Sequence, residues 1–382
     1  MSADAAAGLA SATQGWIDNA TSAVYDVFDG SLLEAALHGL AQLLNCEVGE
    51  LALTGNTTDG LNIAAQMLNT DCIALEDEFA SGPIAWMHGG HTVHFVTASD
   101  VRECDGDVLT AVEVKMAEHP TAKAVLLSSV SWMVGNTYDL GRAGHICAEN
   151  GADLVVDAAQ SLGAEPIDLS HANVAFLCAP SYKWLCAGPG LGVLYASAQV
   201  LKRLGRGSAP FAGWFSQLRK GEADRNNELH PHDDARQFSP GTPNMSVLGA
   251  LVASLRLIEE LGGVDVIQQR LGELSDRLRS ALVDQGFVLM GSFGEPLDYS
   301  NAEDCSRMSA HITGVSTGFA GAEPGAIRDA LAAKGIVVTA KDRHGVRGLR
   351  VSPHVWTMES EIDAFVGTLA GIRAATPPQP RL

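Results

Sequence analysis

The stretch that decides the predicted fold covers residues 152–197 and reads ADLVVDAAQSLGAEPIDLSHANVAFLCAPSYKWLCAGPGLGVLYAS. It holds apolar runs at 152–159, 173–179 and 190–196, each about as long as a buried strand. Asp157 ends the core of the first run, and Lys183 follows the second. Because ligands collect at the carboxyl ends of strands in open α/β sheets, we expect Asp157 and Lys183 on one rim of a sheet, a strand apart.

The residues before this stretch show a similar pattern of apolar runs, together with helix-like segments. Apolar runs at 71–75, 91–96 and 122–130 precede it, and amphipathic segments typical of helices occupy 59–68 and 140–151. Strands of nearly continuous hydrophobicity that are separated by helices indicate βαβ units. We therefore predict an α/β fold with a mainly parallel sheet sandwiched by helices.

Changes of pattern divide the chain into three predicted parts. Residues 1–45 are rich in alanine and leucine and form an N-terminal helical segment, and 46–262 form the large α/β domain. Within it, a charged loop at 219–244 precedes a long helix at 245–262. The remainder, 263–382, opens with a helix at 264–286 and is predicted to be a small α+β domain, with strands at 307–315, 335–341 and 348–353 and helices at 325–335 and 359–372.

Composition narrows the class of protein. With 46% hydrophobic and 18% charged residues the chain is typical of a globular protein, and its net charge of −20 disfavours binding to nucleic acid or anionic lipid. Seven cysteines are scattered without CxxC spacing, which predicts free thiols in a reducing compartment. No signal peptide and no apolar run near the roughly 20 residues of a membrane helix are found, so we expect a soluble cytoplasmic protein.

An acid and a lysine on one rim could form a structural ion pair, and for an arbitrary pair that is the better interpretation. Other residues favour a ligand. Thr57 and Thr58 lie in a turn that opens a predicted helix, where hydroxyl and N–H groups suit a phosphate, although a simple N-cap by Asn56 or Thr57 is the alternative. Further hydroxyl donors are Ser181 and Thr242. A phosphate site, a lysine, a carboxylate and an aromatic ring are what pyridoxal 5′-phosphate (PLP) requires.

The lysine region resembles that of the class V aminotransferase family of fold-type I PLP enzymes, which includes cysteine desulfurases, kynureninases and isopenicillin-N-epimerase-like proteins. The likeness extends in order through TGNTTDGLN (54–62), DEFAS (77–81), the quoted stretch, AGWFS (212–216), SPGTPN (239–244) and LRVSPHVW (349–356). It implies the aspartate-aminotransferase-like fold, a seven-stranded-type sheet with a smaller C-terminal domain, and a homodimer with a shared active site.

The resemblance also implies a role for each matching residue. Lys183 forms the internal aldimine and moves the proton at the substrate Cα, Asp157 pairs with the pyridinium nitrogen, and Arg350 binds the substrate α-carboxylate. Gln160 contacts the 3-oxygen of the ring, and Phe79 stacks on the ring. The phosphate is held by Thr57, Thr58, Ser181 and Tyr182, with Thr242 reaching in from the neighbouring subunit. Further matches to cofactor-contacting positions are Ser81, Ser128 and Trp214.

The sequence departs from the family patterns at several places. Residues 336–350 contain no cysteine, so the persulfide relay of cysteine desulfurases is not expected. Gln160 and Thr242 stand where kynureninases usually have histidine and asparagine, which puts kynurenine hydrolysis in doubt. Residues 1–30 also lack the family's usual N-terminal strand, so the substrate pocket is expected to be unusual.

Two further sequence patterns raise the question of a metal site and of a dinucleotide-binding loop. Histidines in MHGGHTVHF and HPHDD raise the question of a metal, but their spacing fits no familiar pattern and we predict none; the residues are His88, His91, His94, His230 and His232. A substrate contact by His88 or His91 stays open. The GPGLG run at 188–192 precedes a strand and lacks the third glycine, so a dinucleotide loop is rejected.

Together these observations predict a PLP-dependent enzyme that acts on an L-amino acid through an aldimine of Lys183 and a quinonoid. We favour a β-lyase that cleaves a C–S or C–C bond, because the GWF and EFAS motifs lean toward lyase branches and no site for a second substrate is evident. Transamination and epimerisation or racemisation are the alternatives. A non-catalytic protein of this fold is disfavoured because Lys183, Asp157 and Arg350 are all present.

Overall fold

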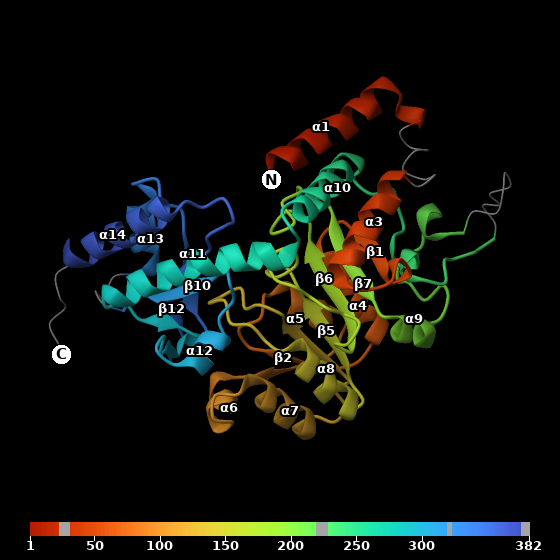
Figure 1. Cartoon of the computed structure of the whole chain (residues 1–382). Helices are drawn as coiled ribbons and strands as arrows, with labels where there is room; N and C mark the ends of the chain where they lie inside the picture. Colours follow the sequence, from red (N-terminus) through yellow and green to blue (C-terminus); the bar gives the residue numbers. More distant parts are fainter. Residues whose placement is uncertain (23–30, 219–227, 319–322, 376–382) are drawn as a thin grey trace.

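The computed structural model describes residues 1–22, 31–218, 228–318 and 323–375. A large α/β domain carries a seven-stranded sheet, and a smaller domain with a five-stranded sheet lies beside it. Figure 1 shows the smaller domain in blue, joined to the large one by the long helix α11 (Val264–Asp284). The loop predicted at 219–244 lies partly outside the described residues.

The large sheet has the strand order β1-β7-β6-β5-β4-β2-β3. Strands β3, β2, β4, β5 and β6 run parallel, whereas β7 is antiparallel to both of its neighbours. The mainly parallel sheet predicted from sequence is confirmed. The strands are β1 (Leu51–Thr54), β2 (Cys72–Leu75), β3 (Val93–Val96), β4 (Ala124–Ser128), β5 (Asp153–Asp157), β6 (Val174–Pro180) and β7 (Gly192–Ala196).

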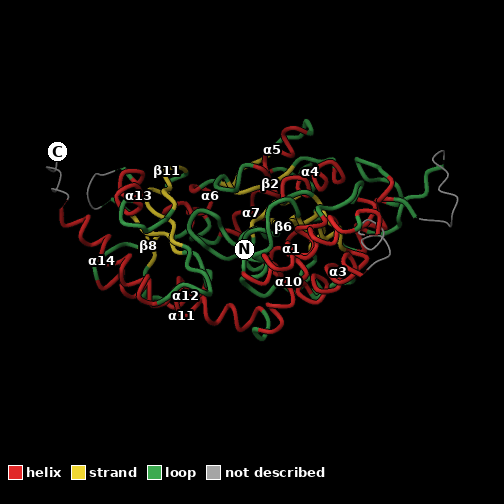
Figure 2. Tube along the Cα trace, turned by 90° about the horizontal axis from the view of Figure 1, so that it is seen from above, coloured by secondary structure: helices red, strands yellow, loops and turns green. Residues whose placement is uncertain are grey.

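Helices cover both faces of this sheet, as Figure 2 shows from above. Alternate strand residues point to opposite faces: Val125 and Leu127 of β4 join one apolar cluster, and Leu126 joins the other. One face packs against α4 (Thr57–Leu68), α5 (Ser81–His88) and α9 (Ala198–Leu204). The other packs against α3 (Ser31–Leu44), α6 (Ala98–Glu103), α7 (Val108–Glu118), α8 (Leu140–Glu149) and α10 (Met245–Glu260).

The N-terminal helix α1 (Ala3–Asp18) lies against α10, and both figures show the two helices side by side. Small residues make this approach close: a Cβ added at Gly8 would lie 2.5 Å from the carbonyl oxygen of Gly249. The hydroxyl of Thr13 also donates to Ser246 Oγ at 2.8 Å. The first 45 residues are therefore helical where described, and they pack on the large domain rather than standing apart.

The small domain is built on an antiparallel sheet of order β11-β12-β10-β8-β9. Leucine and phenylalanine side chains of α11, α13 and α14 cover it in a separate apolar cluster. Its strands are β8 (Leu289–Met290), β9 (Pro296–Leu297), β10 (Thr313–Ser316), β11 (Thr339–Arg343) and β12 (Val346–Val351), and its other helices are α12 (Ala302–Ser306), α13 (Pro324–Ala332) and α14 (Glu359–Ala375).

Several sequence-based expectations need adjustment. The strand predicted over 307–315 is shorter, because 309–312 form a loop whose carbonyl groups accept hydrogen bonds from the buried Arg279. The strand predicted over 335–341 is found at 339–343, and strands β1, β8 and β9 were not predicted. In the described part of the chain no helix is long and apolar enough to cross a membrane.

Candidate active site

Asp157 and Lys183 follow neighbouring strands at the carboxyl edge of the large sheet. Strands β5 and β6 are parallel, with Asp157 opposite Cys178, and Lys183 lies three residues beyond the end of β6. Asp157 is buried, and its Oδ1 accepts a hydrogen bond from the backbone N–H of Ala159 at 2.8 Å. The two residues therefore share one rim, as the strand pattern predicted.

The electrostatic environment of the pair is unusual. Burial lowers the pKa of Lys183, the carboxylate of Asp157 raises it, and the guanidinium of Arg350 lowers it again. Burial raises the pKa of Asp157, which the Ala159 hydrogen bond and the charge of Lys183 oppose. A lysine with a lowered pKa near an acid with a raised pKa is typical of functional sites rather than of a simple surface ion pair.

Arg350 comes to this site from strand β12 of the small domain. Its Nη1 donates to the backbone oxygen of Trp132 at 2.8 Å, and Nη2 lies 3.5 Å from Thr339 Oγ1. Its Nε is buried without a hydrogen-bond partner, and burial lowers the pKa of the guanidinium. A partly buried guanidinium with an unsatisfied N–H can donate to a carboxylate, and the predicted role of Arg350 in binding the substrate stays a prediction.

The predicted phosphate residues Thr57 and Thr58 form the first turn of α4. Asn56 caps the helix, because its side chain accepts from the N–H of Asp59 at 3.0 Å. The cap and a ligand site do not exclude each other, since both threonine side chains remain outside the capping bond. Thr58 Oγ1 donates to Ser81 Oγ at 3.0 Å, which joins the starts of α4 and α5.

Two other predicted hydroxyl donors are already engaged within the chain. Ser181 is fully buried, and its hydroxyl faces the carbonyl oxygens of Gly188 at 2.6 Å and Leu191 at 3.0 Å. Ser128 donates its N–H and its hydroxyl to the two carboxylate oxygens of Glu78, at 2.7 and 2.5 Å. Each would have to give up these bonds to donate to a cofactor, so their cofactor contacts stay predictions.

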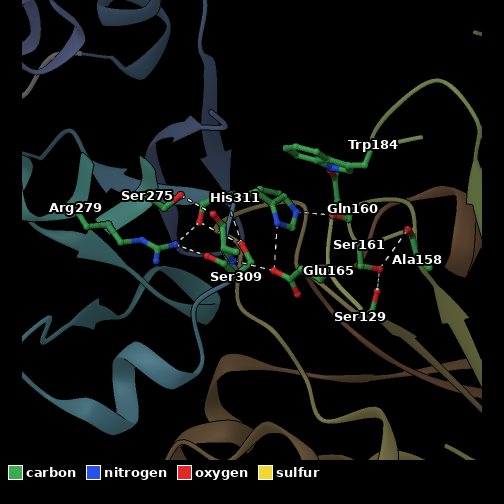
Figure 3. Close-up of polar contacts among 12 residues, drawn as sticks. Ser129, Ala158, Gln160, Ser161, Glu165, Trp184, Ser275, Arg279, Ser309 and His311 are labelled. Atoms are coloured by element: carbon green, nitrogen blue, oxygen red, sulfur yellow. Dashed lines mark hydrogen bonds and ion pairs between the residues drawn. The ribbon is translucent and has the colours of Figure 1, made fainter. Parts of the chain in front are cut away.

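Gln160 links the site to the small domain, as Figure 3 shows. Its Oε1 accepts from Trp184 Nε1 at 3.4 Å, and its backbone oxygen lies 2.5 Å from His311 Nε2. His311 is completely buried, with Nδ1 3.2 Å from Glu165 Oε1 and its ring edge against Trp184 at 4.3 Å. Gln160 is therefore held from both sides, by a neighbour of Lys183 and by a residue of the small domain.

The predicted aromatic residues fall into two groups. Phe79 is partly exposed and meets the ring of Trp132 edge-on at 5.4 Å, and Tyr182 is half exposed next to Lys183. Trp214 and Thr242 instead line two cavities beside β1, of about 210 and 560 Å³. Neither Lys183 nor Arg350 is among the residues that line these cavities, so the cofactor contacts of Trp214 and Thr242 stay predictions.

The histidines of MHGGHTVHF are dispersed. His88 lines the same cavity as Thr242, whereas His94 stacks on His119 at 3.7 Å and lies 4.0 Å from a carboxylate oxygen of Asp71. Within the described ranges, no three His, Cys, Asp or Glu side chains are grouped to hold a metal ion. All seven cysteines are free thiols.

Several residues at the site were not anticipated from sequence. Trp132 accepts Arg350 through its carbonyl oxygen and carries the ammonium of Lys341 on its ring, with Arg343 nearby. His311 and Glu165 hold Gln160. Their side chains reach the site only through the packing of the two domains, and no local motif indicates it.

Known proteins resemble this chain in sequence. The sequence model of the aminotransferase class-V family matches residues 14–365. A kynureninase of Geobacillus thermodenitrificans is 26% identical over 78% of this chain and 69% of its own length, and a probable cysteine desulfurase of Pyrococcus abyssi is 27% identical over 64% and 60%. A kynureninase of Bacillus anthracis is 27% identical over 65% of this chain and 54% of its own length.

Solved structures share the fold. A cystine C–S lyase in complex with its product cysteine persulfide superimposes with a TM-score of 0.81 at 19% identity, covering 97% of this chain and 94% of the lyase. An apo cysteine desulfurase from Thermococcus onnurineus has a TM-score of 0.73 at 21% identity, covering 90% and 84%. With its sheet order, its lysine rim and a family match over most of its length, this chain belongs to the aminotransferase class-V family.

Proposed function

We propose that this protein is a PLP-dependent enzyme that acts on an α-amino acid, with Lys183 as the residue that binds the cofactor covalently. PLP is the cofactor of this family. The observation that carries the proposal is that the charges of Asp157 and Arg350, from different domains, both act on the pKa of Lys183. An ion pair alone would need only one of these partners.

The residues present suit this cofactor. The buried Asp157 would pair with the ring nitrogen, because a carboxylate without water around it favours a protonated partner. The start of α4 with Thr57 and Thr58 would bind the phosphate through N–H groups and hydroxyls. Gln160 and Phe79 would contact the ring, and Arg350 would bind the substrate carboxylate.

When bound, PLP withdraws electrons from the bonds at the substrate Cα. The chain supplies the other functions. Lys183, whose pKa burial lowers, would hold its amine in the neutral form that accepts the Cα proton. Arg350 would fix the carboxylate and thereby orient the substrate toward Lys183. The packing of Trp132 and Phe79 would exclude water from one side.

Within the family we propose a β-lyase, which removes a substituent from the substrate Cβ through its C–S or C–C bond. Support comes from the relatives named kynureninase and cysteine desulfurase and from the GWF and EFAS motifs. Transamination and epimerisation require the same proton movement by Lys183. Both retain the Cβ substituent, which elimination releases, and they differ from each other in where the proton returns.

We also propose a homodimer in the cytoplasm. Thr242 lines a cavity that Lys183 does not line, which supports the predicted phosphate contact from a second subunit. Seven free thiols favour a reducing compartment. Light scattering should give twice the 40.0 kDa chain mass, and a monomer would contradict the shared site.

The cofactor assignment is tested by absorbance and trapping. The purified protein should absorb near ~420 nm, and borohydride should link the cofactor to Lys183. The Lys183→Ala variant should lose the link, whereas Lys334→Ala, an exposed lysine on the small domain, should keep it. A colourless protein that ignores added PLP would contradict the proposal.

The reaction is tested with a panel of L-amino acids. Pyruvate or alanine formed with release of the side-chain fragment supports a lyase. A keto acid formed only when a second keto acid is present supports transamination, and a D-amino acid supports epimerisation. Either of the last two outcomes would overturn the lyase assignment and leave the cofactor assignment intact.

A further inference from the structure

Three cationic side chains share one face of the hairpin formed by β11 and β12. Lys341 and Arg343 lie two residues apart on β11 and therefore point to the same face as Thr339. Arg350 pairs with Thr339 across the ladder, and its Nη2 lies 3.5 Å from the Thr339 hydroxyl. Arg350 and Lys341 are thus diagonal neighbours on one face, a spacing that long side chains bridge.

Trp132 forms the surface against which these cations gather. The Lys341 ammonium lies 3.7 Å from the centroid of the Trp132 ring, and the Arg343 guanidinium carbon lies 6.0 Å from it. Arg350 donates to the carbonyl oxygen of the same tryptophan. The indole is held in place because its Nε1 donates to the Asp77 carbonyl oxygen at 2.7 Å and its ring meets Phe79 edge-on.

Among the residues that the structure describes, no carboxylate forms an ion pair with these three cations. Over the described ranges of the chain, no carboxylate lies within the 4.0 Å of an ion pair from Lys341, Arg343 or Arg350. Lys341 is nevertheless only 6% exposed. Burial, then the charges of Arg350, Arg343 and Lys183, lower the pKa of Lys341 to about 7. Contact with an aromatic face offsets only part of the cost of burying an ammonium.

Neighbouring carboxylates serve other partners. Asp342 points to the opposite face of β11, where it pairs with Arg347 at 3.3 Å. Glu76 lies 3.7 Å from His344 Nδ1. The chain itself therefore supplies cations around Trp132 without the anions to balance them, which is the arrangement expected where an anionic ligand completes the site.

We propose that Lys341, assisted by Arg343, binds a second anionic group of the substrate, so that the preferred substrate is an amino acid whose side chain ends in a carboxylate or sulfinate. The inference rests on the proposed function, in which Arg350 binds the α-carboxylate of the same molecule. Two anionic groups on one substrate would then meet two cations on one sheet face. An amino acid with a neutral side chain would leave Lys341 buried and unpaired.

Binding of simple acids tests this without turnover. Isothermal titration calorimetry of the holoenzyme compares succinate and glutarate with propionate and butyrate, the matched monocarboxylates. We expect at least one dicarboxylate to bind about tenfold or more tightly than its monocarboxylate. The Lys341→Met variant should lose that difference while keeping its affinity for the monocarboxylate. Equal binding of both classes to the native protein would overturn the proposal.

Further variants separate charge from packing. Lys341→Arg should retain the preference because it keeps the cation, and Lys334→Met, which removes an exposed lysine of the same domain, should change nothing. A preference that persists in Lys341→Met would contradict the assignment. An arm with 3-sulfinopropanoate distinguishes the two anions: tighter binding than succinate identifies a sulfinate, and weaker binding a carboxylate.

The two proposals fail in different ways. If the native protein shows no dicarboxylate preference but has normal cofactor absorbance and trapping, only the second anion site is overturned. Absence of the cofactor link at Lys183 would overturn the proposed function, whereas a dicarboxylate preference lost on Lys341→Met would still establish the anion site.

Discussion

Asp157 and Lys183 lie at the carboxyl ends of the neighbouring parallel strands β5 and β6, where their charges act on each other. Burial lowers the pKa of the lysine and raises that of the aspartate, and their mutual attraction opposes both shifts. Burial therefore favours the neutral form of each group, and the attraction between the two charges favours the ionised forms.

Replacing Asp157 by Asn should lower the pKa of Lys183 further, because burial and Arg350 would then act without the carboxylate that opposes them. Reductive methylation located by mass spectrometry measures how the reactivity of Lys183 depends on pH in the apoprotein. The Asp157→Asn profile should move to lower pH. Asp153→Asn is the matched control, since Asp153 begins β5 and pairs with Arg203 at 2.6 Å. Identical profiles for Asp157→Asn and native protein would contradict the coupling.

Replacing Arg350 by Gln should raise the KM for amino-acid substrates by about 100-fold, because truncating one partner of a buried charge pair leaves the substrate carboxylate unpaired. Arg350→Lys should restore only part of the loss, since an ammonium lacks the planar fork. Steady-state kinetics are the measurement. Arg347→Gln on the opposite face of β12, where Arg347 pairs with Glu323 and Asp342, should leave KM near native. An unchanged KM in Arg350→Gln would remove Arg350 from the substrate site.

Glu78 should make the stability of the protein depend on pH. Burial raises its pKa from 4.5 to about 8, against the hydrogen bonds from Ser128. Because the folded pKa is the higher one, the folded state binds more protons between pH 4.5 and 8, and stability from this group is lost as the pH rises through 8. The Glu78→Gln variant mimics the protonated form, so it should keep this contribution to stability as the pH rises.

Urea unfolding at pH 6 and pH 9 checks this effect. Between pH 6 and pH 9, the free energy of unfolding of the native protein should fall by on the order of 2 kcal/mol more than that of Glu78→Gln. Burial also raises the pKa of Asp77, but Asp77 is present in both proteins. The difference in stability loss between them therefore reports on Glu78. The exposed Glu113→Gln variant should follow the native protein. Equal losses in native protein and Glu78→Gln would show that Glu78 is ionised throughout.

His311 should act as a positioning residue for Gln160. His311→Ala removes a fully buried ring and its contact with the Gln160 carbonyl oxygen, so it should lower the free energy of unfolding by about 2–4 kcal/mol. It should also shift the absorbance of the bound cofactor in the same direction as Gln160→Ala. The exposed His145→Ala should do neither. A loss of stability without any spectral shift would make His311 a structural residue only.

Local patterns account for much of this protein. Continuous apolar runs predict buried parallel strands because helices cover both faces of such a sheet, and all six predicted runs of the large domain contain strands. The place of Asp157 and Lys183 follows from the same pattern, since parallel strands bring their carboxyl ends to one edge. Strand β1 was not predicted, although it is as long as β2 and β3.

The sheet, its carboxyl rim and the neighbouring positions of Asp157 and Lys183 follow from the sequence pattern, because they depend on the spacing of consecutive apolar runs along the chain. Only the tertiary structure decided that Arg350 and Lys341 face Trp132, that His311 holds Gln160, and that Ser181 and Ser128 bond within the chain. These contacts join residues far apart in the chain. They depend on the register of β11 with β12 and on the docking of two domains, which no local pattern encodes.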